Sequence, residues 1–420
     1  MTGPQVRILT GTDPERLVAT DHTVWFDEVP GRSAEEQLIG LPDTHRFAAE
    51  VDGADPGTYA GIYGVFPLTL SVPGGARPRS IPCAGLTWVG VHPDHRRKGV
   101  LTAMIRDHLE RVRAEERTHV SALHASEPGI YGRYGYGLAS LELHVSLSRG
   151  ATLTAPHLDT EAALITTHLA SVADPDVAKR LRECHLAQAR LGEVVGAEGY
   201  YERICTEPPE RLRDKEPHRV LFARRDGRDV GFAIFRRSHK WEKARPAGEL
   251  EVMALVGGPA ALLTLSRRLV DFDLMGTVKL RGVGADDPVI HWAGGPRSTS
   301  DVETYDSLWV RLVDLPEALE ARAWSAPCDV VVEVEDAAAP WNHGVWRIRA
   351  GAAGEAEVAR ATETADVRLP VQALGAAYLG GGNLVAMLRA GLIEERRAGA
   401  AAELWRGLRT DMAPAAAMPF

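Results

Sequence analysis

The first 150 residues contain short apolar runs, which are typical of strands, and then apolar positions with the longer period of a helix. Apolar runs on both sides of the turn-forming Asp52-Gly53 predict a pair of strands within residues 47–65. Residues 84–91 form a short apolar run, which predicts a buried strand. From Val100 onward the apolar residues recur every three or four positions and predict an amphipathic helix, and residues 120–124 predict the next strand.

A weaker copy of this order lies between residues 220 and 284. Two apolar runs flank Asp226-Gly227, a strand is predicted at residues 249–256, a helix follows, and another strand is predicted at residues 278–280. The turn before the helix is Gly257-Gly258-Pro259 in this copy and has no basic residue. We therefore expect a duplicated domain whose second copy lacks an anion-binding turn.

The remaining residues form a third segment of helices and alternating strands, which begins near Ser307-Leu308-Trp309. At about 150 residues per domain, the 420 residues of the chain are enough for two or three domains. We expect a mixed α/β protein of the α+β class, with domains at residues 1–148, 149–305 and 306–420.

Composition and charge narrow the possible functions. The formal net charge is −9, which disfavours a nucleic-acid-binding surface spread over the molecule. The four cysteines lie far apart, so neither a disulfide framework nor a zinc site is expected, and His92 and His95 have no third metal ligand nearby. The first residues contain no signal-like apolar segment, and no apolar run reaches the ~18 residues that a membrane helix needs. We therefore expect a cytoplasmic protein with no metal, no membrane insertion and no nucleic-acid partner.

The strongest chemical signal is Arg96-Arg97-Lys98-Gly99, which we call the basic turn and which separates a predicted strand from a predicted helix. The first backbone N–H groups of a helix have no partner within it and carry the positive end of the helix dipole, so they favour a bound anion. Gly99 lets the backbone approach a ligand closely, and the three cations add charge. A solvated surface turn would be the better interpretation without the flanking strand and helix. With them, the pattern favours a diphosphate site.

A second signal is the tyrosine loop, residues 128–137, in which three of the nine tyrosines lie among glycines. The rings of Tyr134 and Tyr136 are expected to seal the end of a sheet. Tyr131 differs, because a phenol with a pKa of about 10 suits the protonation of a departing thiolate, whose own pKa is about 8.5–10.

Arg96-x-x-Gly99-x-Leu101 resembles the acetyl-CoA-binding signature of the GCN5-related N-acetyltransferases (GNATs), Arg/Gln-x-x-Gly-x-Gly/Ala, although Leu101 stands where that superfamily has Gly or Ala. With the segment from His124 to Gly137, with residues 309–312 and with the three-part chain, the resemblance becomes specific for the Eis (enhanced intracellular survival) family. It covers nearly the whole chain. It implies two tandem GNAT-like folds, of which the first is active, followed by a domain like sterol carrier protein.

The resemblance also implies which residues carry the reaction. Acetyl-CoA is the implied co-substrate, and the backbones of Val89 and Val91 would pair with its pantetheine arm. Tyr131 matches the proposed general acid of the family, and the C-terminal carboxylate of Phe420 matches its general base. The residues implied to bind the coenzyme are Val89, Val91, Arg96, Arg97, Gly99, Leu101 and Ser126.

By the same resemblance, the expected function is acetyl transfer to primary amines of aminoglycosides or similar cationic amines, at several positions, by direct transfer in a ternary complex. The implied assembly is a homohexamer. Two alternatives stay open. One is a protein-lysine acetyltransferase, which shares the chemistry, and the other is a lipid- or small-molecule-binding protein that uses the GNAT folds as a scaffold.

Four further residues are candidates for the acceptor pocket, and each has a simpler interpretation. Trp88 is expected to form an aromatic wall for the acceptor, or else to pack in the core. Asp27 and Glu28 would attract a cationic substrate, or they are solvated surface acids. His124 would line the pocket, or it is a strand histidine with an ordinary partner.

Overall fold

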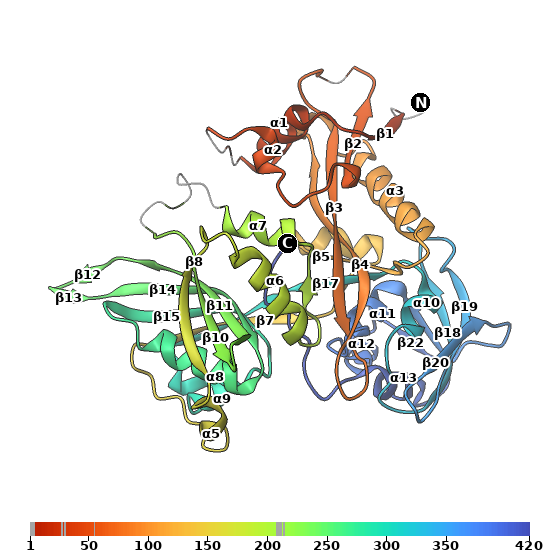
Figure 1. Ribbon diagram of the computed structural model, residues 1–420. Helices are drawn as coiled ribbons and strands as arrows, with labels where there is room; N and C mark the ends of the chain where they lie inside the picture. Colours follow the sequence, from red (N-terminus) through yellow and green to blue (C-terminus); the bar gives the residue numbers. More distant parts are fainter. Residues whose placement is uncertain (1–4, 27, 29–30, 54, 207–211, 213–214) are drawn as a thin grey trace. The chain divides into compact units, whose positions relative to one another are not determined.

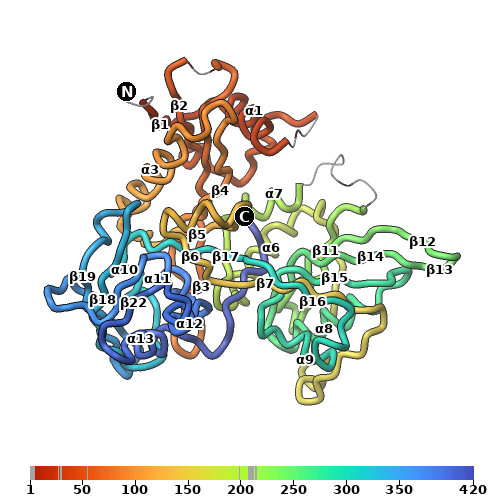
Figure 2. The backbone as a smooth tube through the Cα atoms, turned by 180° about the vertical axis from the view of Figure 1, so that it is seen from behind, coloured from red at the N-terminus to blue at the C-terminus, as the bar shows by residue number. Residues whose placement is uncertain are grey.

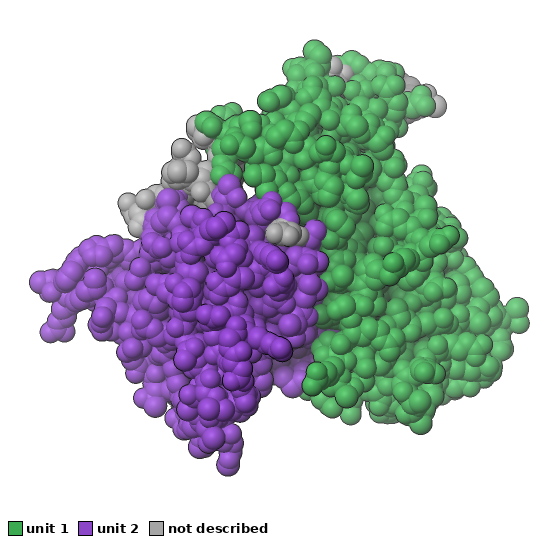
Figure 3. Space-filling model, in the orientation of Figure 1, with its two compact units in different colours: residues 1–139, 308–411, 420 green, residues 140–307, 412–419 purple. Residues whose placement is uncertain are grey.

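The computed structural model of the protein describes residues 5–26, 28, 31–53, 55–206, 212 and 215–420. The chain divides into two compact units, which are coloured separately in Figure 3. Unit 1 contains the residues up to Ala139, residues 308–411 and Phe420, and unit 2 contains residues 140–307 and 412–419. In sequence, most of unit 2 is therefore an insertion between two segments of unit 1.

Unit 1 contains a mixed sheet in which a long helix connects two parallel strands (Figure 1). The helix, α3 (Val100–Ala114), buries Met104, Ile105 and Leu109 in the core beside this sheet, as the spacing of its apolar residues predicts. The predicted helix from Val100 and the predicted strand at residues 120–124 are confirmed. The strands are hydrogen-bonded in the order β1 (Val6–Thr10), β2 (Arg46–Val51), β3 (Gly61–Val72), β4 (Arg79–Val91), β5 (Val120–His124), β17 (Leu308–Leu312) and β6 (Gly137–Leu138).

Shorter elements of unit 1 surround this sheet. The helix α1 (Pro14–Trp25) packs on β3 and β4 and begins after Asp13, whose side chain accepts a hydrogen bond from the N–H of Glu15. The others are α2 (Ala34–Gln37), η1 (Asp43–His45), η2 (Pro93–His95), α4 (Pro128–Tyr131) and η3 (Gly132–Tyr134).

The strand β17 comes from the far side of the insertion. It lies between β5 and β6 and is antiparallel to both, with Leu308 opposite His124 and Trp309 opposite Leu138. The expected third domain begins at residue 306, and the structure places the first strand of that segment in the first sheet. Both segments of unit 1 therefore contribute to a single sheet.

A second, smaller sheet follows in unit 1. Its strands are hydrogen-bonded in the order β20 (Ala356–Arg360), β19 (Gly344–Ala350), β18 (Cys328–Glu335), β21 (Val367–Pro370) and β22 (Glu394–Glu395). Its helices are α10 (Leu315–Glu320), α11 (Val371–Ala377), α12 (Leu384–Arg389) and α13 (Ala400–Leu408). The helix α13 packs on β18, whereas α11 packs on β17 and β6 of the first sheet, as Figure 2 shows from behind.

Unit 2 has its own sheet and core. The strands are β16 (Asp301–Asp306), β7 (Leu141–Ser148), β15 (Met275–Val283), β14 (Gly248–Gly257), β11 (Arg228–Ser238), β10 (Arg219–Arg225) and β8 (Thr166–Ser171), in that order across the sheet. The helix α8 (Pro259–Val270) connects the parallel strands β14 and β15, so the predicted order of strand, helix and strand is confirmed. The other elements are α5 (Asp159–Ala162), α6 (Val177–Gln188), β9 (Val194–Val195), α7 (Glu198–Cys205), β12 (Trp241–Glu242), β13 (Arg245–Pro246), α9 (Pro288–Trp292) and η5 (Pro296–Ser298).

Two kinds of feature are absent from the described residues. None of the helices in this part of the chain is both long enough and apolar enough to cross a bilayer. Nowhere in it do three or more His, Cys, Asp or Glu side chains gather as a metal ion would require.

Candidate active site

The strands β4 and β5 separate shortly after they begin to pair. Their parallel pairing, in the described residues, covers Ala84 and Gly85 of β4 against Ser121 and Ala122 of β5. We call the point after these pairs the fork. Past the fork, the end of β4 and the end of β5 no longer share hydrogen bonds, and backbone groups of β4 become available to a ligand.

A bulge in β4 bends the strand at this point. Gly64 lies opposite Thr87 and Ile62 lies opposite Gly90, so Tyr63 faces two residues, Trp88 and Val89. Trp88 has a φ of +53°, a left-handed conformation that is uncommon for a residue other than glycine. An extra residue bends and twists the strand that carries it, which accounts for the separation of β4 from β5.

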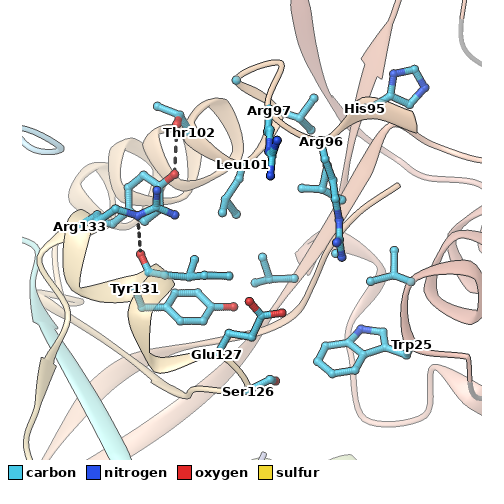
Figure 4. A pocket seen from close by; sticks show the side chains of 18 residues that line it. Trp25, His95, Arg96, Arg97, Leu101, Thr102, Ser126, Glu127, Tyr131 and Arg133 are labelled. Carbon is cyan, nitrogen blue, oxygen red and sulfur yellow. Dashed lines mark hydrogen bonds between the residues drawn. The ribbon is translucent and has the colours of Figure 1, made fainter. Parts of the chain in front are cut away.

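A pocket of about 730 Å³ begins at the fork. It is enclosed by the end of β4, the basic turn, the first turn of α3, the end of α1 and the start of the tyrosine loop (Figure 4). The lining residues are Val24, Trp25, Val89, Gly90, Val91, His95, Arg96, Arg97, Gly99, Val100, Leu101, Thr102, Ser126, Glu127, Ile130, Tyr131, Arg133 and Tyr134. Every residue expected to bind the coenzyme, and Tyr131, is in this set.

The basic turn presents the start of α3 to this pocket. Gly99 is the N-cap of the helix with a φ of +85°, and Arg97 has a φ of +61°. No side chain caps the helix and its first turn contains no acidic residue, so its first N–H groups keep their capacity to bind an anion. Burial and the charge of Lys98 lower the pKa of His95, which keeps this pocket histidine neutral at neutral pH.

A diphosphate fits this arrangement. Gly99, Val100, Leu101 and Thr102 all line the pocket, and the guanidinium groups of Arg96 and Arg97 extend into it (Figure 4). Guanidinium groups and helix N-terminal amides are the partners that phosphate oxygens prefer in proteins. The coenzyme implied by the sequence resemblance therefore has suitable donors on this chain.

Tyr131 lies across the pocket from the basic turn. Its hydroxyl points toward the cavity, near the carboxylate of Glu127 (Figure 4). Burial raises the pKa of Tyr131 to about 12, and the negative charge of Glu127 and the neighbouring Tyr134 act in the same direction. Tyr131 is therefore a neutral phenol at physiological pH, which is the form that can donate a proton.

A buried polar network supports the fork from below. The Ser121 hydroxyl donates to the carbonyl of Ala84 at 2.9 Å, which leaves its oxygen to accept from the Tyr136 hydroxyl and from Nε2–H of His108, each at 2.8 Å. Burial lowers the pKa of His108 to about 3, so its ring stays neutral and the network stays intact at ordinary pH. The ring of Tyr136 in turn packs edge-on against Tyr131, with the centroids 6.0 Å apart.

The candidate acceptor residues and Phe420 lie in other places. Trp88, His124, Glu28 and Phe420 do not line the pocket described above. The ring of Phe420 packs edge-on against His124 with the centroids 5.2 Å apart, and its Cε2 would be 3.0 Å from a Cβ on Gly85. Glu28 is exposed, and Asp27 lies outside the described residues.

Among the pocket residues that sequence reasoning missed, an aromatic residue and an acid have a clear chemical character. Trp25, the last residue of α1, lines the pocket with 44% of its surface exposed. Glu127, just before the tyrosine loop, brings a carboxylate into it. A large aromatic residue at an amphipathic helix end was the signal for the first. The second had only its position beside Ser126 as a signal.

Comparison with protein families agrees with this geometry. A model of the acetyltransferase (GNAT) domain matches residues 5–139, and a second acetyltransferase (GNAT) model matches residues 192–329. A sterol carrier protein domain model matches residues 315–416. Each GNAT match contains a strand, a helix and a parallel strand in succession, which are β4, α3 and β5 in the first match and β14, α8 and β15 in the second.

Comparison with individual proteins extends over nearly the whole chain. An uncharacterized N-acetyltransferase of Streptomyces avermitilis is 37% identical over 96% of this chain and 98% of its own length. The N-acetyltransferase Eis of Mycobacterium tuberculosis is 28% identical over 78% of both chains. The crystal structure of Eis1 from Mycobacterium abscessus covers 99% of this chain and all of its own with a TM-score of 0.80, at 26% identity. With the fork, the basic turn and the GNAT matches, these similarities show that the chain belongs to the Eis-like family of GCN5-related N-acetyltransferases and is an acetyltransferase enzyme.

Proposed function

We propose that this protein transfers an acetyl group from acetyl-CoA to primary amines of aminoglycosides or similar cationic amines, at several positions of the acceptor, by direct transfer in a ternary complex. One observation carries the proposal. A single pocket contains both an uncapped helix N-terminus with two arginines and a protonated tyrosine. The first feature suits the diphosphate of the coenzyme and the second suits its departing thiol.

The binding roles follow from the position of each group along the pocket. Arg96, Arg97 and the backbone at Gly99 hold the diphosphate, and Leu101 and Ser126 contact the coenzyme beside it. The backbones of Val89 and Val91, past the fork, pair with the pantetheine arm. When bound, acetyl-CoA supplies the acetyl group as a thioester. The N–H of Val89 donates to the thioester oxygen as negative charge develops there.

Proton transfer requires one acid and one base. Tyr131 donates its phenolic proton to the leaving sulfur, and the burial that raises the pKa of the phenol also raises that of the thiol, so the transfer remains matched. The α-carboxylate of Phe420 accepts the ammonium proton of the acceptor, directly or through water. The contacts of the Phe420 ring with His124 and Gly85, two residues of the diverging strands, support this role.

The preference for a cationic acceptor has a physical basis in charge. The net charge of −9 attracts cations to the molecule as a whole. The Glu127 carboxylate and the Trp25 ring add a local anion and an aromatic face inside the pocket, and both favour an ammonium group. The family resemblance extends the proposal to a cytoplasmic homohexamer.

The test combines a substrate panel with one substitution. Purified protein is incubated with acetyl-CoA and a panel of aminoglycosides, polyamines, lysine peptides and neutral amines, and the products are identified by mass. Tyr131→Phe is expected to lower kcat about 100-fold, the usual contribution of a general acid, while calorimetry gives an unchanged Kd for acetyl-CoA. Tyr134→Phe is the matched control, because its hydroxyl also reaches the pocket but contacts Thr102 at 3.1 Å.

Each outcome has a separate meaning. Acetylation confined to lysine peptides would exclude the aminoglycoside proposal and leave the chemistry in place. A Tyr131→Phe variant with full kcat would remove the general-acid role. A short extension beyond Phe420 tests the base in the same way, since activity that survives a displaced carboxylate requires a different proton acceptor.

A further inference from the structure

The glycines of the tyrosine loop have no role in the proposed chemistry. The loop contains Gly129, Gly132, Gly135 and Gly137, and none of them lines the pocket. A glycine that is not needed for a ligand indicates either an unusual backbone angle or a close approach of other atoms. The atoms around each position distinguish these two cases.

Three of the four glycines abut elements from the far side of the insertion. A Cβ on Gly132 would lie 3.0 Å from Nε2 of Gln372 in α11. A Cβ on Gly135 would lie 2.7 Å from Cγ1 of Val371 and 2.8 Å from Nε of Arg311, and one on Gly137 would collide with the carbonyl oxygen of Gln372. The space around Gly129, in contrast, is open to beyond 4 Å.

Glycine is needed on both sides of this contact, because backbone atoms of α11 touch backbone atoms of β17 and β6. A Cβ on Gly375 of α11 would collide with the carbonyl oxygen of Val310 in β17 and would lie 3.2 Å from the backbone nitrogen of Gly137. The helix α11 is buried on nearly all sides, and Gln372 is its half-exposed residue. Small residues on both sides thus let α11 lie directly against β17 and β6.

The surroundings of α11 are held by a buried ion pair. Arg311 of β17 donates to both carboxylate oxygens of Asp336, at 2.7 and 2.8 Å, and both side chains are almost fully buried. Asn342 donates a further hydrogen bond to the same carboxylate at 3.1 Å. Nη1 of Arg311 also donates to the carbonyl of Leu312 at 2.8 Å, so both terminal nitrogens of the guanidinium are held, and the Arg311 side chain beside Gly135 provides a fixed wall.

We infer that α11 of the sterol-carrier-like domain is the platform that sets the position of the Tyr131 hydroxyl, with Gln372 as a positioning residue. This inference rests on the proposed role of Tyr131 as general acid. The tyrosine side chain precedes Gly132 directly, so a displacement of Gly132 moves the phenol relative to the pocket. The sterol-carrier-like domain thereby acts in catalysis through packing, and this role needs no bound lipid.

Gly132 offers a clean test because its backbone accepts other residues. Its φ of −55° and ψ of −34° are ordinary helical values, so the neighbouring Gln372 is the obstacle to a side chain there. Gly132→Leu is expected to lower kcat about tenfold, since a shift of the catalytic group by a fraction of an ångström has effects of this order, and to leave the KM for acetyl-CoA unchanged. Gly129→Leu, three residues earlier and facing open space, is the matched control and is expected to keep kcat.

Two double variants make the result specific. Gln372→Ala combined with Gly132→Leu removes the obstacle and is expected to restore kcat to that of Gln372→Ala alone. In the Tyr131→Phe background, Gly132→Leu is expected to have no further effect on kcat, because the phenol it displaces is gone. Three results would each overturn the inference. They are an equal loss of kcat in Gly132→Leu and Gly129→Leu, a kcat that Gln372→Ala does not restore, and a tenfold loss of kcat from Gly132→Leu in the Tyr131→Phe background.

A measurement without turnover separates this inference from the proposed function. Amide hydrogen exchange of the Gln372→Ala variant is expected to be faster in residues 130–137 and unchanged in α3. If Tyr131→Phe retains full kcat but this exchange pattern is seen, the general-acid proposal fails and the platform stands. If exchange in residues 130–137 is unchanged, α11 does not hold the loop, and the inference fails whatever the kinetics show.

Discussion

The two GNAT-like folds differ most at the turn that precedes their central helix. In the first fold, α3 begins at Gly99 after two arginines and a lysine. In the second, α8 begins at Gly258 with Pro259 in its first position. Both follow a parallel-paired strand with a bulge, because β14 also carries an extra residue where its register with β11 shifts. Neither helix has a side-chain cap.

The first helical turns of the two folds also differ in how far they are exposed to solvent. Thr102 in the first turn of α3 is exposed, and its neighbour Leu101 is half-buried. In the first turn of α8, Pro259 is exposed, whereas Ala260, Ala261 and Leu262 are all buried in the core of unit 2. A strand, a bulge and an uncapped helix therefore provide the framework of a coenzyme site, since both folds contain them. The site itself requires an open first turn and cations beside it.

The largest effect is expected when the cations of the first turn are removed. Arg96→Ala combined with Arg97→Ala should weaken acetyl-CoA binding by at least about 100-fold, because each charge-assisted contact contributes roughly 1.5–3 kcal/mol. Calorimetry measures the Kd. Arg106→Ala with Arg117→Ala is the matched control, since both are exposed in unit 1 outside the pocket and the change in net charge is the same. If both double variants weakened acetyl-CoA binding equally, the effect would come from the net charge of the protein and not from the basic turn.

A second substitution compares the glycines that begin the two helices. Gly99 has a φ of +85° whereas Gly258 has a φ of −72°, so alanine is strained only at the first position. The left-handed conformation costs about 1–2 kcal/mol for a residue with a Cβ, and Gly99→Ala should therefore weaken acetyl-CoA binding about tenfold as the turn relaxes. Gly258→Ala should leave the Kd unchanged. Similar effects at both positions would contradict the assignment of the site to the first fold.

A third substitution sharpens the description of the first turn. Leu101 stands where the GNAT signature has Gly or Ala, and its side chain lines the pocket. Leu101→Ala should bring the turn closer to the signature, let the coenzyme approach the helix N-terminus more closely, and raise the affinity for acetyl-CoA by about threefold or less, which is about 0.7 kcal/mol. A tenfold loss of affinity, measured in the same calorimetric series, would instead assign Leu101 a packing contact with the coenzyme.

The smallest effect concerns pH and the phenol of the first fold. With a pKa of about 12, Tyr131 stays protonated far into the alkaline range, and its acid form is lost only as the pH rises through 12. We therefore expect kcat to remain level between pH 9 and 10.5, approximate limits chosen to bracket an ordinary tyrosine pKa. An unperturbed tyrosine would leave only about a quarter of the activity at the upper limit. A decline of that size, absent from Tyr131→Phe, would show that the pocket does not shield the phenol.

Local patterns in the sequence were enough for the elements around the fork. The helix from Val100 follows from apolar residues that recur every three or four positions, and the strand at Val120–His124 follows from a short apolar segment. Both signals depend only on near neighbours. The part of the pocket lining that comes from the basic turn and the tyrosine loop was also predictable, because each is a short segment whose residues share one local environment. Family resemblance supplied their roles.

Contacts between residues far apart in the sequence could not be predicted from these local patterns. The position of β17 between β5 and β6 joins residues on both sides of the insertion, and no local period reports a partner so far away. The contact of Gln372 with Gly132 is hidden for the same reason. The left-handed φ of Trp88 arises from the bulge opposite Tyr63, so it depends on the register of two strands and not on the residue type.

The late arrival of β17 has a consequence for how the protein is made. While a ribosome is still adding residues 140–307, strand β5 has no neighbour on one side, because β17 has not been synthesised. All strands of the unit 2 sheet lie within residues 141–306, so the whole of that sheet is synthesised before β17. Domains fold as units during synthesis, and an open strand edge is a template for wrong pairing. The nascent chain therefore passes through a stage with one complete sheet and one sheet whose β5 edge is open to wrong pairing.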